Sequence, residues 1–412
     1  MQRTQPGSLI ILKIIWKENM KNTLSVISNS RSLSRSGQNI RLSLLVFGLI
    51  LWSLTSAYAA PGDLDTSFGN SGRVLTSITS NSLNYAYAVE IQLDGKIITA
   101  GRTNPLGFAL ARYNTDGSLD SSFGNGGIVT TSVGNNCGNC YAAALAIQPD
   151  GKIIAAGTGR GSVNGAYAFV RYNTNGTLDT SFGDGGIVKI ELGANSETIR
   201  DIALQPDGKI VAVGSDYIDG TPEDDDFALL RLNIDGSPDA SFGTGGIVIT
   251  SFTTKHDYAY AVAIQTDGKI VVAGSAGEGI NFSPDFALAR YNTNGSLDNT
   301  FGNDGKVVTP FFSGNFFDKA QSVIIQPDNK IIAVGRASDG TNGGFALARY
   351  TANGSLDSSF GSEGKVFTVF SSDSGASAAS LQSNGKIIAA GSVFGPAADF
   401  ALARYNSNGT ID

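Results

Sequence analysis

The chain has 412 residues, carries a net charge of −7 and contains a single histidine. One histidine excludes an H-E-x-x-H zinc site and any metal site built from several histidines. Because an acidic chain repels phosphate backbones, we predict that the protein does not bind nucleic acid.

Residues 1–59 are predicted to be a leader with a secretory signal peptide. Arg31, Arg35 and Arg41 precede an apolar run at 42–54, and Ala57-Tyr58-Ala59 follows it. A basic segment, a short apolar core and an A-x-A site are typical of such signals, although an uncleaved anchor is the alternative. Cleavage would remove seven basic residues and one acidic residue, changing the net charge from −7 to −13. We therefore expect a secreted or cell-envelope protein with no membrane span after cleavage.

The rest of the chain, residues 60–412, is one repeated unit. Phe-Gly pairs at Phe68, Phe123, Phe182, Phe242, Phe301 and Phe360 are spaced by 55, 59, 60, 59 and 59 residues. A period of this size with alternating apolar residues indicates propeller blades or a β-solenoid. Four strands are expected in the fourth unit, at 259–265, 269–275, 286–292 and 305–309. Four strands per unit favour a propeller.

The two ends of the repeat differ by one strand. A fourth-strand sequence at 73–76 precedes the first complete unit, whereas the chain stops at Asp412, where the next fourth strand would begin. Pairing of 67–76 with 400–406 would remove an exposed sheet edge. The sequence thus predicts an all-β, six-bladed propeller of four-stranded antiparallel blades, closed by an N-terminal outer strand and monomeric. A truncated reading frame is the alternative.

Two motifs carry a resemblance to a known family. Each unit contains versions of Q-x-D-G-K-I-x-x-A-G and F-A-L-A-R-Y-N-x-x-G-x-L-D-x-S-F-G. Over residues 63–412 the chain resembles the delta-60 repeat proteins, which are bacterial and usually exported. The resemblance implies a β-propeller of unknown function, and it supplies no catalytic residues.

An Arg recurs eight residues before an Asp in every unit. The pairs are Arg112/Asp120, Arg171/Asp179, Arg231/Asp239, Arg290/Asp298, Arg349/Asp357 and Arg404/Asp412. They flank the turn of a hairpin, where a charge-assisted hydrogen bond would hold the turn. We interpret them as structural, with six equivalent ligand sites as the alternative.

A single binding site would be built from residues that break the repeat. The Asp-Gly-Lys and Asn-Gly turns are expected on one face of the ring, and loops that differ between units on the other, here called the variable-loop face. Binding residues commonly lie on variable loops held by a rigid scaffold. The candidates on this face are Asp216, Asp219, Glu223, Asp224, Asp225, Asp226, His256, Phe311, Phe312, Phe316 and Phe317.

These candidates favour binding over catalysis. The acidic loop does not match the EF-hand spacing, so we interpret it as solvated and predict no metal and no cofactor. His256 is not accompanied by a G-x-S-x-G motif, and an exposed loop histidine is expected. The four phenylalanines form either a partner-binding patch or a satellite core.

The two cysteines, Cys137 and Cys140, are separated by two residues. A thioredoxin-type site would need a helix start that the sequence does not predict. In an oxidising compartment we expect a local disulfide between them.

Together these features predict an exported, non-catalytic scaffold that binds a protein or a glycan, and not an enzyme. The alternative is a propeller enzyme, a carboxylate-based hydrolase or lyase on the variable-loop face, with Ca²⁺ as a candidate metal.

Overall fold

The computed structural model describes residues 63–80, 82–104, 107–134, 140–161, 165–192, 198–217, 225–278, 283–314, 316–370, 372–395 and 398–412. These residues contain 23 β-strands and no α-helix. Accordingly, no helix in the described ranges is long and apolar enough to cross a membrane. The predicted leader lies outside the described residues.

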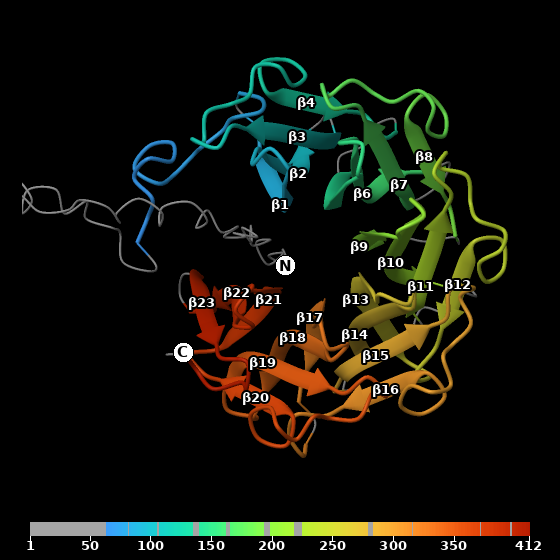
Figure 1. Ribbon diagram of the computed structural model, residues 1–412, viewed down its shortest axis with the longest axis vertical. Helices are drawn as coiled ribbons and strands as arrows, with labels where there is room; N and C mark the ends of the chain where they lie inside the picture. Colours follow the sequence, from blue (N-terminus) through green and yellow to red (C-terminus); the bar gives the residue numbers. More distant parts are fainter. Residues whose placement is uncertain are drawn as a thin grey trace, which may run out of the picture. The chain divides into compact units, whose positions relative to one another are not determined.

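The strands form six antiparallel sheets, the blades of a propeller, and the first strand of each blade lies nearest the centre of the ring (Figure 1). Blades 1 to 3 consist of β1 (Asn84–Ile91), β2 (Ile97–Thr103), β3 (Gly107–Tyr113) and β4 (Ile128–Thr131); β5 (Tyr141–Ile147), β6 (Ile153–Arg160), β7 (Gly165–Tyr172) and β8 (Ile187–Ile190); and β9 (Thr198–Leu204), β10 (Ile210–Tyr217), β11 (Asp225–Leu232) and β12 (Ile247–Thr250). Blades 4 to 6 consist of β13 (His256–Ile264), β14 (Ile270–Glu278), β15 (Asp285–Tyr291) and β16 (Lys306–Thr309); β17 (Lys319–Ile325), β18 (Ile331–Ser338), β19 (Gly343–Tyr350) and β20 (Lys365–Thr368); and β21 (Ser374–Leu381), β22 (Ile387–Val393) and β23 (Asp399–Tyr405). The predicted six-bladed, all-β propeller is confirmed.

The turn between the first two strands of blade 2 shows why the Asp-Gly-Lys sequence recurs. Gly151 has a φ of +84°, a left-handed conformation that glycine adopts at little cost. The Lys152 amide donates to Asp150 Oδ1 at 3.1 Å, and the Gln148 amide donates to the Lys152 carbonyl at 2.8 Å. These bonds close the hairpin and fix its register.

The innermost strand of each blade carries a β-bulge opposite a glycine of the second strand. In blade 4, Ala259 pairs with Gly274 and Ala261 pairs with Ala273, so Tyr260 is the extra residue. A Cβ on Gly274 would lie 1.8 Å from the Tyr258 carbonyl oxygen, so only glycine fits there. Because a bulge redirects side chains out of the regular pleat, the inner strands present extra side chains near the centre of the ring.

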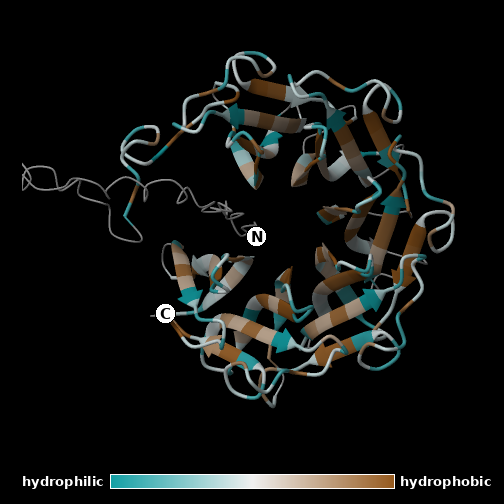
Figure 2. Ribbon diagram, in the orientation of Figure 1, coloured by the Kyte–Doolittle hydropathy of each residue, from teal (hydrophilic) through white to brown (hydrophobic). Residues whose placement is uncertain are grey.

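Apolar side chains hold consecutive blades together. Five hydrophobic clusters join blade 1 to 2, 2 to 3, 3 to 4, 4 to 5 and 5 to 6. In the first of them, Phe108 and Leu110 of β3 pack with Ile153 and Tyr172 of blade 2, and all four are fully buried. Burying each such side chain contributes about 1.5–3 kcal/mol. Figure 2 shows the hydrophobic residues mostly on strands and the hydrophilic ones mostly on turns and strand ends.

The last blade differs from the other five because it has three strands, ordered β21-β22-β23. Phe400 and Leu402 of β23 are 78% and 67% exposed, whereas Phe345 and Leu347, at the same positions of β19, are fully buried. The apolar face that the other blades bury against their successor is therefore open here.

Residues 67–76 contain no strand in the described structure, and their pairing with 400–406 remains a prediction. Within this segment the structure has one isolated bridge, between Gly69 and Arg73. The turn before residues 73–76 matches the turn before β4: the Gly72 amide donates to the Phe68 carbonyl at 2.8 Å and the Gly69 amide to the Asp116 carbonyl at 2.7 Å, as the Gly127 and Gly124 amides donate to Phe123 and Asn175 at 2.8 Å. The described residues 63–75 cluster with 116–118 in a second compact unit.

Candidate functional site

The predicted acidic loop is only partly described. Asp219, Glu223 and Asp224 lie outside the described residues, and only the backbone of Asp216, in β10, is described. Asp225 and Asp226 begin β11 and are half-buried. No group of three or more His, Cys, Asp or Glu residues in the described ranges is arranged to hold a metal ion.

The four phenylalanines do not form one patch. Phe311 is 6% exposed, and its ring centroid lies 4.7 Å from that of Phe286. Phe252 and Phe370 make the equivalent contact in neighbouring blades, so Phe311 belongs to the repeated core. Phe312 packs against Phe367 with ring centroids 4.9 Å apart. Phe316 is half-buried, and Phe317 lies 5.1 Å from Lys319 Nζ.

The repeated Arg and Asp lie together in all six blades, with the Arg Nε between 2.5 and 2.8 Å from an Asp oxygen. In blade 1, Lys96 Nζ also donates to Asp120 at 2.8 Å. Burial alone would raise the pKa of Asp120, but hydrogen bonds from Lys96 and Ser122 and the charge of Arg112 outweigh it and hold that pKa below its usual range. The carboxylate is therefore a permanent anionic anchor for both cations.

In blades 1 to 5 the Arg also reaches the following blade, a role that the sequence did not reveal. Its Nη1 donates to a turn carbonyl there; the partners are Arg112 and Thr174, Arg171 and Ile234, Arg231 and Thr293, Arg290 and Ala352, and Arg349 and Ser407. The guanidinium has five donors in a rigid fork, so it holds its own turn and joins two blades at once.

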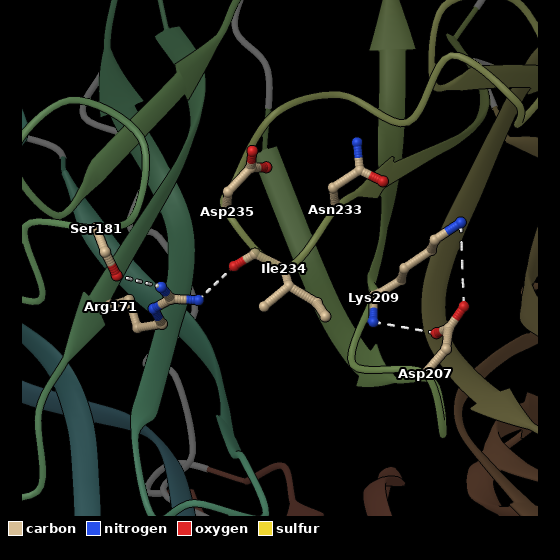
Figure 3. Close-up of a pocket in the computed structure, with 7 residues that line it drawn as sticks. All are labelled: Arg171, Ser181, Asp207, Lys209, Asn233, Ile234 and Asp235. Carbon is tan, nitrogen blue, oxygen red and sulfur yellow. Dashed lines mark hydrogen bonds and ion pairs between the residues drawn. The ribbon is translucent and has the colours of Figure 1, made fainter.

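A hollow of about 460 Å³ lies beside this network between blades 2 and 3 (Figure 3). It is lined by Arg171, Ser181, Asp207, Lys209, Asn233, Ile234 and Asp235. Figure 3 shows the Arg171 guanidinium directed at Ser181 and at the Ile234 carbonyl, contacts that belong to the network above. Because most of these residues recur at the same positions in other units, we interpret the hollow as a product of blade packing.

The innermost strand of blade 4 carries a row of rings that does break the repeat. His256, Tyr258 and Tyr260 occupy alternate positions of β13 and are all half-buried. The ring centroids of His256 and Tyr258 are 5.9 Å apart at an interplanar angle of 14°, and those of Tyr258 and Tyr260 are 6.2 Å apart at 37°. We call these three residues the β13 aromatic row.

Two cations from the flanking blades lie against this row. The Arg200 guanidinium, on β9 of blade 3, is 5.8 Å from the centroid of the Tyr260 ring. Lys319 Nζ, on β17 of blade 5, is 5.4 Å from the same centroid. Both distances are within the ~6 Å range of cation–π attraction. Arg200 is exposed, whereas Tyr260 and Lys319 are half-buried, so three blades contribute to one surface, here called the inner-strand cluster (Arg200, Tyr260 and Lys319).

Asp225 of blade 3 holds the other end of the aromatic row. Tyr258 Oη donates to Asp225 Oδ2 at 2.7 Å, and His256 Nδ1 lies 3.0 Å from the same oxygen. The Asp225 amide also lies 3.2 Å from His256 Nδ1, but Nδ1 cannot donate and accept at once. We assign it as the donor because a hydrogen bond to a carboxylate is stronger, which leaves Nε2 as the acceptor.

This arrangement corrects the expectation of an exposed loop histidine. His256 is the first residue of β13, and its side chain is 20% exposed. The paired Asp225 carboxylate and the stacked Tyr258 ring draw the imidazole against the strand.

A second group of rings lies on the inner strands of blades 1 and 2. The Tyr85 and Tyr87 centroids are 6.1 Å apart, and Tyr87 lies 5.1 Å from Tyr141. The Arg102 guanidinium lies 4.9 Å from the Tyr85 centroid. The combination of tyrosine rings with a cation thus occurs twice around the inner strands.

Sequence reasoning missed these inner-strand residues because it looked for variation in the loops. A signal was present in the first strand, where the position of Tyr260 is occupied by Tyr87, Ala143, Arg200, Gln321 and Ser377 in the other units. The residue at the neighbouring Ala261 position is small in most units, whereas the residue at the bulged position differs in size and charge from unit to unit.

Cys140 is 4% exposed and disulfide-bonded. Cys137, its predicted partner, lies outside the described residues.

The repeats match a known family. A family model described as "Domain of unknown function (DUF5122) beta-propeller" matches residues 92–123, 148–182, 205–242, 265–301, 326–360 and 382–412. These six matches cover half of the chain. The chain belongs to this β-propeller family. No curated protein matches it.

Solved structures with a similar fold include a polysaccharide lyase, ulvan lyase, at 12% identity and a TM-score of 0.48, covering 78% of this chain and 80% of that one. An α-L-arabinofuranosidase from Fusarium graminearum is 11% identical with a TM-score of 0.46, covering 84% and 96%. Sqt1 from Chaetomium thermophilum, bound to the N-terminus of ribosomal protein L10, is 11% identical with a TM-score of 0.42, covering 79% and 86%.

These likenesses concern the fold alone. Because solved structures of similar fold include enzymes, the prediction drawn from the residues that the protein is not an enzyme does not hold, and a non-catalytic role is not retained.

Proposed function

We propose that this protein is an exported β-propeller with repeats of the delta-60 type, and that it binds a glycan on the inner strands at the variable-loop face. The observation that carries the proposal is the β13 aromatic row, in which His256, Tyr258 and Tyr260 stand at alternate positions of one innermost strand. Tyrosine offers an apolar ring face beside a polar hydroxyl, which suits partners that are apolar on one side and polar on the other. Saccharide rings have this character.

The row is also held rigidly, which favours binding. Tyr258 is fixed by its 2.7 Å hydrogen bond to Asp225, and Tyr260 projects from a bulge whose geometry Gly274 enforces. A ligand then loses less free energy to ordering of the protein than it would on a flexible loop. Export is supported by the predicted signal peptide at 1–59, and an exported propeller would meet envelope or extracellular glycans.

The test is a glycan array probed with the mature protein, followed by titration of the strongest hit. Replacing Tyr260 with Leu should weaken binding at least tenfold, or about 1.4 kcal/mol. Phe394→Leu is the matched control, because Phe394 is an aromatic residue of blade 6 that is 42% exposed and lies outside the aromatic row. Absence of any glycan hit, or equal losses in the two variants, would refute the proposal. N-terminal sequencing of the exported protein tests cleavage of the leader.

A second candidate function, acid–base catalysis on the bound glycan, is favoured by the contacts of Asp225. This carboxylate accepts a hydrogen bond from Tyr258 and fixes the orientation of His256, an arrangement that leaves His256 Nε2 as a base. Incubation with the array hits followed by mass spectrometry would reveal chain cleavage. A wild-type protein that cleaves and a His256→Gln variant that binds without cleaving would establish it.

A further inference from the structure

The inner-strand cluster places two positive charges around one aromatic ring. Arg200 and Lys319 come from different blades and lie 5.8 and 5.4 Å from the Tyr260 centroid. Neither belongs to the Arg and Lys residues that recur in every unit and bind the repeated Asp. The repeat therefore gives no structural reason for cations at these two positions.

Local charge, and not the net charge of the chain, decides what this cluster attracts. The chain carries −7 overall, but charges farther away than the Debye length of about 8 Å are largely screened at physiological ionic strength. Two carboxylates near the row are engaged: Asp225 Oδ2 accepts from Tyr258 at 2.7 Å and lies 3.0 Å from His256 Nδ1, and Asp201 accepts from the amides of Ile202 at 2.9 Å and Val262 at 3.0 Å. The exposed charge beside Tyr260 is therefore that of Arg200, with Lys319 half-buried.

We propose that the glycan bound here is anionic, a saccharide that carries carboxylate or sulfate groups. Its anionic group lies between Arg200 and Lys319, and a sugar ring packs on Tyr260. A guanidinium donates two parallel hydrogen bonds to a carboxylate or a sulfate, and lysine adds a point charge. This inference rests on the proposed function, since it specifies which glycans the aromatic row accepts.

The surroundings of Tyr260 and Tyr258 differ, and this difference supports an anionic group beside Tyr260. The blades before and after blade 4 supply the two cations, at 5.8 and 5.4 Å from the Tyr260 centroid, so a saccharide beside this ring meets a positive group from each of them. Tyr258, the next ring of the row, is 6.2 Å away and hydrogen-bonded to a carboxylate, so its surroundings favour the neutral hydroxyl groups of an adjacent sugar. The row thus combines an anionic subsite with a neutral one.

The experiment is calorimetric titration of the mature protein with three oligosaccharides of equal length. One is neutral, one is composed of uronates, and one consists of neutral sugars that carry sulfate esters. An anionic oligosaccharide should bind at least tenfold tighter than the neutral one, and raising the salt concentration should remove most of that difference. Arg200→Ala and Lys319→Ala should each reduce anionic binding about tenfold and reduce neutral binding less than that. Lys189→Ala, which removes an exposed cation of the outer strand β8, should change neither.

The outcomes separate the two proposals. Equal affinity for neutral and anionic oligosaccharides, lost in Tyr260→Leu but retained in Arg200→Ala, overturns this inference and leaves glycan binding intact. Absence of binding to all three overturns both. A preference for the uronate over the sulfated oligosaccharide, or the reverse, assigns the anionic group.

Discussion

The Arg that joins neighbouring blades gives the sharpest test of how the ring is held together. Arg231 is 5% exposed, and its Nε donates to Asp239 at 2.7 Å while Nη1 donates to the Thr293 carbonyl of the next blade. Removing one partner of a buried pair costs about 3–5 kcal/mol. The lower end applies here because Lys209 Nζ still pairs with Asp239 at 2.8 Å. Loss of the Thr293 contact adds about 1 kcal/mol.

Arg231→Ala should therefore lower the free energy of unfolding by about 3–4 kcal/mol, and the melting temperature by roughly 4–5 °C. Arg404→Ala is the matched control, since Arg404 occupies the same position in the last blade. Its side chain is 42% exposed, and surface ion pairs contribute little. Thermal and urea unfolding of both variants measures the difference. Equal losses would refute the inference that burial and the contact with the next blade give the Arg its importance.

The other predictions also compare equivalent positions. Phe345→Ala should lower the free energy of unfolding by about 3–5 kcal/mol, because Phe345 is fully buried. Phe400→Ala should lower it by less than about 1 kcal/mol, because Phe400 is 78% exposed. A similar loss at both positions, measured by urea unfolding, would instead indicate that β23 is covered in solution. Gly157→Ala should destabilise blade 2 by at least about 1–3 kcal/mol, because its Cβ would lie 2.0 Å from the Tyr141 carbonyl oxygen, and Gly185→Asn should be tolerated at a φ of +60° in open space. Burial and the charge of Asp318 raise the pKa of Asp285 from 3.8 to about 6; the folded state then binds more protons than the unfolded one between these values, so stability should fall as the pH rises from 4 to 6. Melting curves of Asp285→Asn should lack that decline.

Much of the fold was predictable because the same turn and ion-pair motifs recur in six units. The Asp-Gly-Lys turn needs a residue with positive φ, which Gly151 supplies, and the Arg and Asp pairs face each other across a turn whose length is constant. Each of these features depends on residues close together in the chain. A wrong assignment of a strand or turn in one unit would conflict with the same motif in the other five units.

Contacts between blades were less accessible from the sequence. The reach of Arg112 to the Thr174 carbonyl spans 62 residues and depends on the angle between two blades, which no local pattern encodes. The packing of Phe312, which follows blade 4, against Phe367 of blade 5 has the same origin. The end of the ring was the hardest case, since the similarity of 73–76 to the fourth strands does not specify the strand with which each segment pairs.

The position of the candidate site follows from what a repeated scaffold leaves free. A residue that must hold each blade, such as Arg231 or Gly274, cannot vary without cost, so recognition is confined to positions where the repeat tolerates change. In this propeller such positions include the bulged residues of the inner strands, where the pleat is already interrupted and an extra side chain displaces no core contact. Tyr260 occupies one of them, with Arg200 at the equivalent position one blade before. Because the blades converge at the centre, residues about 60 positions apart in the chain lie within 6 Å of one ring. A composite site can thus arise from single changes in separate units while the blades that carry it stay the same.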